Sequence, residues 1–190
     1  MDDSKRIRTK DQLKEYLDVE MADYRVTNPR QLVARVFLTS ERAILGKHIK
    51  LLRTTEYHVN TGHKLRALWY NARLMKFQIR YGMRIPVNSC GKGLSIAHAA
   101  PCGVTAGTSV GENFRLHMLA WAVGDGTDEG VPTIGDDVIL GVGAKIVGKV
   151  TVADHISIGA NSVVTKDFLE PNCTIAGVPA RKLKNTSVFF

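Results

Sequence analysis

The chain has 190 residues, of which 44% are apolar, enough for one compact domain or for a core with a smaller appended piece. It has no apolar run of 18 residues, and its N-terminal segment MDDSKRIRTKDQ is polar, so we expect a cytoplasmic protein without a membrane span or signal peptide. The net charge of +8 is uneven: residues 1–82 carry 17 Lys and Arg against 9 Asp and Glu, whereas residues 83–190 carry 9 of each.

The basic first half allows two interpretations. A basic face can attract phosphates, a membrane surface or nucleic acid. The alternative is a set of solvated helix faces, which we favour because the cations are dispersed among acids. No basic-aromatic motif is present, so we expect no nucleic-acid partner. A weak contact of this region with a membrane surface stays open.

Residues 1–82 predict four amphipathic helices, because apolar side chains recur at spacings of three and four. Thr9 and Gln12 form a possible capping box before the first helix, which would extend to Tyr24. Asn28-Pro29 would begin the second helix, with Leu32, Val33, Val36 and Phe37 on its apolar face.

Ser40 would cap the third helix, which ends at Asn60-Thr61-Gly62. The fourth runs from about Lys64 to Tyr81, and Gly82 suits its left-handed C-terminal position. We expect one apolar stripe of this fourth helix to face inward, namely Leu65, Leu68, Trp69, Ala72 and Ile79.

After Gly82 the apolar period becomes six. The repeating positions are Ile134, Leu140, Ile146, Val152, Ile158 and Val164, preceded in the same phase by Val104, Val110, Leu116 and Ala122. Helices and single strands have periods of 3.6 and 2, so a sustained period of six indicates a solenoid.

Two irregularities interrupt the repeat. Cys90 and Ile96 keep the period but lie two residues out of phase, so two residues are inserted near Ala99–Gly103. The turn-rich stretch GDGTDEGVPT, residues 124–133, predicts a loop that leaves the solenoid.

The three cysteines, Cys90, Cys102 and Cys173, form no CxxC pair. An odd and sparse count argues against a disulfide framework and a structural zinc site. We expect buried free thiols.

The repeat [Ile/Leu/Val]-[Gly/Ala]-x-x-[small or Val]-x resembles that of the hexapeptide-repeat acyltransferases, which are trimeric triangular prisms that bind acetyl-CoA between neighbouring prisms. The segments GKGLSIAH (91–98), IGDDVILGVGAKIVG (134–148) and IAGVPARKLK (175–184) are similar to serine acetyltransferases. The short helical region is closer in size to related proteins of bacterial surface-polysaccharide pathways.

The resemblance implies a mainly β chain. We expect a left-handed parallel β-helix over residues 83–180 with the loop at 124–133, an N-terminal α-helical region over residues 1–82, and a C-terminal tail over residues 181–190. It also implies a homotrimer, with a hexamer through the helical region as a further option.

Acetyl transfer to a hydroxyl needs a general base, and an imidazole suits this role. Each coil of such a prism has three sides, and Ile96, Val104, Val110 and Leu116 are repeat positions on successive sides. Leu116 therefore lies on the same side as Ile96, one coil later, so His98 and His117 should lie on the same face of successive coils. His98 matches the position of the catalytic base in the resemblance. His117 is the second candidate or an assisting group, and a histidine at a polar trimer seam is the structural alternative.

Three departures concern the acceptor. Met83 and Ala97 occupy positions where serine acetyltransferases carry Asp, and Glu129-Gly130-Val131-Pro132 replaces their Asp-Arg-His-Pro. A desolvated amino acid needs partners for both its charges. We therefore expect a sugar or glycan acceptor, with L-serine as the alternative, and with Asp125, Asp128 or Glu129 as candidate acceptor-binding residues.

Matched positions assign acetyl-CoA, as co-substrate, to Val142, Ala160, Thr165, Lys166 and Arg181. Small residues allow close backbone approach, and the two cations suit phosphate oxygens. A prism of this kind could also be a non-catalytic trimeric scaffold or a zinc hydratase. The hydratase would need three converging histidines, so we expect no metal.

Overall fold

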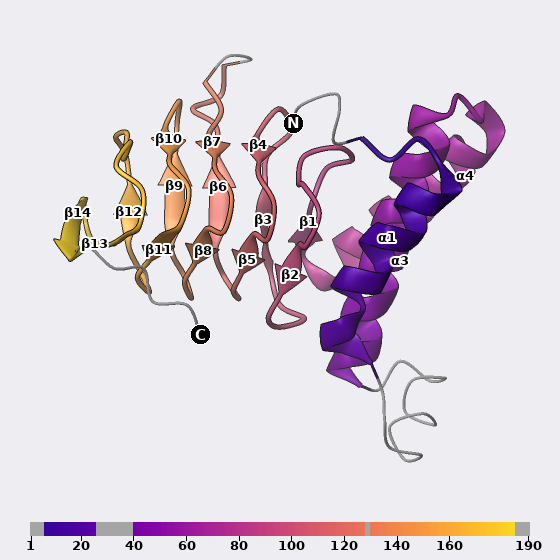
Figure 1. The fold of residues 1–190 in the computed structure, drawn as a ribbon, viewed down its shortest axis with the longest axis horizontal. Helices are drawn as coiled ribbons and strands as arrows, with labels where there is room; N and C mark the ends of the chain where they lie inside the picture. The colour runs from indigo at the N-terminus through magenta and orange to yellow at the C-terminus, as the bar shows by residue number, and fades with distance from the viewer. Residues whose placement is uncertain (1–5, 26–39, 128–129, 185–190) are drawn as a thin grey trace.

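A computed structural model describes residues 6–25, 40–127 and 130–184, and it has a helical part followed by a three-sided β-solenoid (Figure 1). The helices are α1 (Lys10–Glu20), the short 3-10 helix η2 (Ala22–Tyr24), α3 (Glu41–Asn60) and α4 (Lys64–Tyr81). They pack at the end of the solenoid that carries β1 and β2, and β13 and β14 lie at the opposite end.

The helix ends follow the sequence closely. Thr9 and Gln12 form the expected capping box, although α1 ends at Glu20 and η2 carries Tyr24. Ser40 precedes α3 without a side-chain cap, and Gly82 terminates α4 at φ 68°, in the left-handed region. The helix expected after Pro29, with Leu32, Val33, Val36 and Phe37, lies outside the described residues.

The prediction for the inward face of α4 is wrong. Leu65, Leu68, Trp69 and Ile79 are 84%, 70%, 53% and 74% exposed, and Ala72 is exposed as well. The buried side chains are Leu74, Phe77 and Gln78 on the other side of the helix. This helix has two apolar stripes, and the one with Phe77 and Tyr81 packs with the core and α3.

The described strands form three sheets, one on each side of a left-handed parallel β-helix. The first contains β1 (Met83–Arg84), β3 (Cys102–Val104), β6 (Trp121–Val123), β9 (Lys145–Val147) and β12 (Val163–Val164). The second contains β4 (Ser109–Val110), β7 (Thr133–Ile134) and β10 (Thr151–Val152). The third contains β2 (Ser95–Ile96), β5 (Arg115–Leu116), β8 (Ile139–Leu140), β11 (Ile156–Ile158), β13 (Cys173–Gly177) and β14 (Ala180–Lys184).

Each six-residue repeat forms one side of the prism, because consecutive repeats fall on consecutive sheets. In the third sheet Ile96 pairs with Leu116, Leu116 with Leu140, and Leu140 with Ile158. All four side chains are at most 2% exposed, so each coil adds one stacked apolar layer to the core. Gly141 is required by this stacking, since a Cβ there would lie 2.6 Å from the Ile158 carbonyl oxygen of the next coil.

The irregular positions also agree with the sequence. Residues 97–101 fill the wider connection from β2 to β3, and β6 ends at Val123 whereas β7 begins only at Thr133, which is where the loop was expected. The strand β14 (Ala180–Lys184), which includes the first residues of the tail expected at 181–190, pairs antiparallel with β13. The three cysteines are buried free thiols, as expected, and burial raises the pKa of Cys90 and Cys102 to about 12.

Candidate active site

His98 lies on the connection that follows β2. Ala97 N donates to Leu116 O at 3.0 Å and Ala100 N donates to His98 O at 2.9 Å, which fixes the backbone on both sides of the imidazole. The Nδ1 atom of His98 is 3.4 Å from the Glu41 Oε1 atom, and the same oxygen accepts from Ala99 N at 2.9 Å. The first residue of α3 therefore reaches the segment that carries the predicted base.

His117 follows β5, the strand that pairs directly with β2. The two predicted histidines are thus neighbours on successive coils, as the repeat implied. Burial, the Arg115 guanidinium and His98 all lower the pKa of His117 below its usual value. A neutral His117 at neutral pH can accept a hydrogen bond without adding charge beside His98.

Two of the predicted CoA residues share this edge of the prism. Val142 follows β8 and Ala160 follows β11, and both strands belong to the same sheet as β2 and β5. Backbone hydrogen bonds link the turns from coil to coil: Gly143 N donates to Met118 O at 3.0 Å, and Asn161 N donates to Val142 O at 2.8 Å. The edge is therefore a continuous column from the histidines towards the C-terminal coils.

The other predicted site residues lie elsewhere in a single chain. Thr165 and Lys166 follow β12 and Asp125 follows β6, so all three lie at the next corner of the prism, and Arg181 lies on β14. The Oδ1 atom of Asp125 accepts from the Thr127 backbone N at 2.9 Å and from its hydroxyl at 2.7 Å, which lowers the pKa of Asp125. Asp128 and Glu129 lie outside the described residues.

A cavity of about 370 Å³ adjoins the His98 segment between the helices and the prism. Its walls carry two carboxylates, Asp23 and Glu41, and two cations, Arg42 and Arg115. The Nε atom of Arg115 is buried and has no hydrogen-bond partner in the described part of the chain. Neither histidine lines this cavity, but Ala97, directly before His98, and Arg115, two residues before His117, do. The cavity can hold a small zwitterion or a polar neutral molecule next to these two segments.

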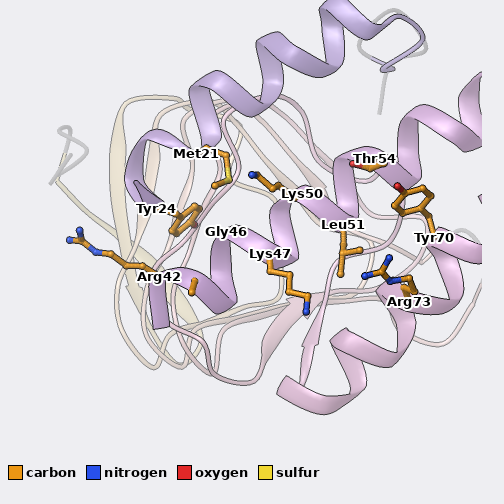
Figure 2. Close-up of a pocket in the computed structure, with 11 residues that line it drawn as sticks. Met21, Tyr24, Arg42, Gly46, Lys47, Lys50, Leu51, Thr54, Tyr70 and Arg73 are labelled. Carbon is orange, nitrogen blue, oxygen red and sulfur yellow. The ribbon is translucent and has the colours of Figure 1, made fainter. Parts of the chain in front are cut away.

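A second cavity, of about 410 Å³, lies between η2, α3 and α4 and is basic (Figure 2). It has an apolar wall of Met21, Tyr24, Leu51 and Tyr70, together with four cations, Arg42, Lys47, Lys50 and Arg73. No ion pair joins these cations to a carboxylate within residues 6–25, 40–127 and 130–184. Figure 2 shows Arg42 extending away from the other three. Tyr24 and Arg42 also line the 370 Å³ cavity, so the two are adjacent.

A metal site and a membrane-spanning helix each have structural requirements, which can be compared with the described residues. They contain no group of three His, Cys, Asp or Glu side chains arranged to hold a metal ion. None of their helices combines the length and apolar composition needed to cross a bilayer.

Curated relatives of this sequence are serine acetyltransferases. A Helicobacter pylori serine acetyltransferase is 32% identical over 126 residues, which are 64% of this chain and 72% of that protein. The chain belongs to the serine acetyltransferase family. A Bacillus pumilus member is also 32% identical, over 121 residues that are 61% of this chain and 55% of that protein. The chain spans about half the length of several such relatives.

Solved structures of serine acetyltransferases share the fold. The Neisseria gonorrhoeae protein has a TM-score of 0.70 at 22% identity, covering 96% of this chain and 70% of that one. A serine acetyltransferase solved in complex with CoA has a TM-score of 0.68 at 24% identity, covering 92% and 71%. No family model matches the chain. The expected similarity to surface-polysaccharide proteins stays a prediction.

For this serine acetyltransferase family member, sequence reasoning missed Asp23, Glu41, Arg42 and Arg115. The first three lie in the helical region, and no period or motif connects them with the prism. Arg115 immediately precedes the β5 core position Leu116 and lies two residues before His117. Its place beside a candidate histidine was the one available signal.

Proposed function

We propose that the chain is an acetyl-CoA-dependent O-acetyltransferase in which His98 is the general base. The observation that supports this best is the pair of adjacent histidines on one prism edge beside a cavity of mixed charge. The acceptor hydroxyl gives its proton to His98 Nε2 as its oxygen attacks the thioester carbonyl. The tetrahedral intermediate then expels the CoA thiolate, which takes the proton back, leaving an acetyl ester and CoA.

L-serine is the acceptor that the relatives favour, so the sugar acceptor becomes the second candidate. The missing family residues at Met83, Ala97 and Val131 argued against serine. The structure offers other partners for its charges, because Asp23 can face an ammonium group and Arg115 a carboxylate. A charge-assisted hydrogen bond contributes roughly 1.5–3 kcal/mol, so two such contacts can offset the family residues that are missing.

A phosphate-bearing sugar is the second candidate, and the basic cavity is the observation that supports it. Lys47, Lys50 and Arg73 suit phosphate oxygens, and this cavity adjoins the one beside His98. A nucleotide sugar could place its phosphates there and its sugar hydroxyl at the imidazole.

We further propose that the CoA site is completed between protomers of a homotrimer. Val142 and Ala160 lie on one edge of the prism, whereas Thr165 and Lys166 lie at the next corner. One chain cannot bring both sets to the same pantetheine chain, but two prisms packed edge to edge can. Arg181 on β14 is then available to the phosphate end of CoA.

An acceptor screen with acetyl-CoA, read by CoA release, tests the reaction and the acceptor together. We expect turnover with L-serine, and a loss of roughly 10²–10⁴-fold in kcat for His98→Ala, which is the usual contribution of a general base. For His117→Ala we expect a smaller loss.

Three results would contradict these assignments. Normal turnover in His98→Ala with loss in His117→Ala would reverse the two histidines. Turnover with nucleotide sugars but not with serine, abolished by Lys50→Ala, would establish the second candidate. Absence of acetyl transfer to every acceptor, with acetyl-CoA still bound, would favour the non-catalytic scaffold.

A further inference from the structure

The structure assigns Glu41, the first residue of α3, as the positioning residue that orients His98. This inference rests on the proposed function and names a part of the same site. The contact joins segments far apart in the chain, from the helical region to the prism. It supplies a carboxylate to His98, whereas no described residue of the prism places one within ion-pair distance of this imidazole.

The geometry around His98 supports this role. Glu41 Oε1 accepts the Ala99 backbone N–H at 2.9 Å and lies 3.4 Å from His98 Nδ1. Of the described carboxylates, Glu41 alone is within ion-pair distance of His98. A carboxylate facing Nδ1 favours the tautomer that carries its proton there and leaves the Nε2 lone pair available as the base. At 3.4 Å the contact is an ion-pair distance, so the carboxylate acts on the imidazole through its charge.

Other contacts hold Glu41 in this place. Its helix is fixed on the first coil by Arg53, which donates to Cys90 O at 2.9 Å and to Gly91 O at 2.7 Å. Nearby, the Tyr24 hydroxyl donates to Ile96 O at 2.9 Å and accepts from Ile96 N at 2.8 Å. A carboxylate at the first position of a helix is also favoured by the helix dipole. The start of α3 is thus held against the segment that carries His98.

The prism has no substitute for this carboxylate at the neighbouring positions. Met83 is 1% exposed in the core, and Ala97, directly before His98, has no polar side chain. His117 interacts with His98, and Arg115 lines the adjoining cavity, but neither is an anion that could pair with a protonated Nδ1. The orienting anion therefore comes from the helical region.

The test uses the full-length protein and the variant Glu41→Gln. Glutamine keeps an oxygen for the Ala99 N–H but removes the charge. We expect 15N NMR of the histidine rings, assigned with His98→Ala, to show Nδ1-protonated His98 in the wild type and a mixture of tautomers in Glu41→Gln. We expect kcat to fall by roughly 10- to 100-fold with an unchanged KM for acetyl-CoA. A fully buried triad aspartate is worth about 10⁴-fold, and the Glu41 side chain is 52% exposed.

Glu15→Gln is the matched control, because Glu15 also forms an exposed ion pair with the prism, 2.7 Å from Lys92 Nζ. It should leave the His98 tautomer and kcat unchanged. The inference is overturned if Glu41→Gln keeps the wild-type tautomer, or if Glu15→Gln changes it equally. The NMR readout needs no turnover, so it decides this role even if no acceptor is acetylated and the proposed function fails.

Discussion

At the scale of single residues, His48 is a buried titratable group outside the candidate site. It is 0% exposed on α3, its ring stacks on Phe77 at 6.0 Å, and its Nε2 atom is 3.1 Å from Gln78 Nε2. The same Gln78 nitrogen donates to Ile85 O, so His48 Nε2 acts as an acceptor and the ring is neutral. Burial, with Arg53 nearby, lowers the pKa of His48 to about 4.

This shift predicts a loss of stability in mild acid. Below pH 6.5, the pKa of this imidazole in the unfolded chain, His48 binds a proton in the unfolded state but not in the folded state. The free energy of unfolding therefore falls as the pH decreases towards 4. Between pH 7.5 and pH 5 the loss from this residue is roughly 2 kcal/mol by linkage. Urea unfolding of His48→Gln should lack this part of the pH dependence. If the free energy of unfolding of His48→Gln changed with pH as much as that of the wild type, the prediction would be refuted. His155→Gln, at a half-buried position in the prism, is the control.

At the scale of elements, a buried ion cluster joins the helices to the prism. Arg53 of α3 donates to Glu20 of α1 and to Glu56, at 2.6 Å and 2.8 Å. Glu20 Oε1 also accepts from Gly93 N and Leu94 N, each at 3.1 Å. Burial raises the pKa of Glu56, with Arg53 opposing the shift. Two helices and one coil therefore share a single cation.

Removal of that cation should be strongly destabilising. In Arg53→Met, Glu20 and Glu56 stay buried without a counter-charge, and breaking a buried pair in this way costs about 3–5 kcal/mol. Urea unfolding at fixed protein concentration measures the loss. The triple variant Glu20→Gln, Arg53→Met, Glu56→Gln should recover part of it, since no unpaired charge remains. A loss in the single variant no larger than that of a typical surface substitution, about 0.5 kcal/mol, would contradict the cluster's role.

At the scale of the whole molecule, α4 leaves an apolar stripe exposed. The stripe consists of Leu65, Leu68, Ala72, Met75 and Ile79, at spacings of three and four that suit helix–helix packing. The same stripe on a second copy is self-complementary about a two-fold axis. We propose that it joins two trimers into the hexamer that the sequence left open.

A change of two stripe residues should separate such trimers. For Leu68→Lys with Ile79→Lys, light scattering should give three chains of 20.9 kDa each, about 63 kDa, instead of twice that mass. Asn71→Lys, exposed on the same helix outside the stripe, should keep the larger assembly. A wild-type mass equal to that of three chains would refute the hexamer.

The fold could be predicted from the sequence because three six-residue repeats make one coil of the prism, so the spacing of the apolar residues fixes where each lies. Ile96, Leu116, Leu140 and Ile158 stack because the period alone fixes their sheet. The buried face of α4 could not be predicted, since both stripes have helical spacing and only the packed structure selects between Leu68 and Leu74.

For the candidate site, the period places His98 beside His117 without any structure. Glu41 could not be predicted, because its contact with Ala99 spans 58 residues and depends on how the helices dock on the first coil. The same repeat also predicts that Asp125 and Lys166 lie at a different corner of the prism from His98 and His117. These four residues could therefore meet in one site only if a second chain contributed some of them. The roles of these residues stay predictions.

The two extra residues between β2 and β3 have a consequence for how such a protein can change. They widen one corner without altering which sheet receives Val104 or any later repeat. The longer connection between β6 and β7 lies at a different corner and likewise leaves the order of the sheets unchanged. Segments at separate corners can therefore gain or lose residues independently while the stacked interior keeps its register. Acceptor preference could then diverge among relatives through changes in corner length, with the histidine edge left as it is.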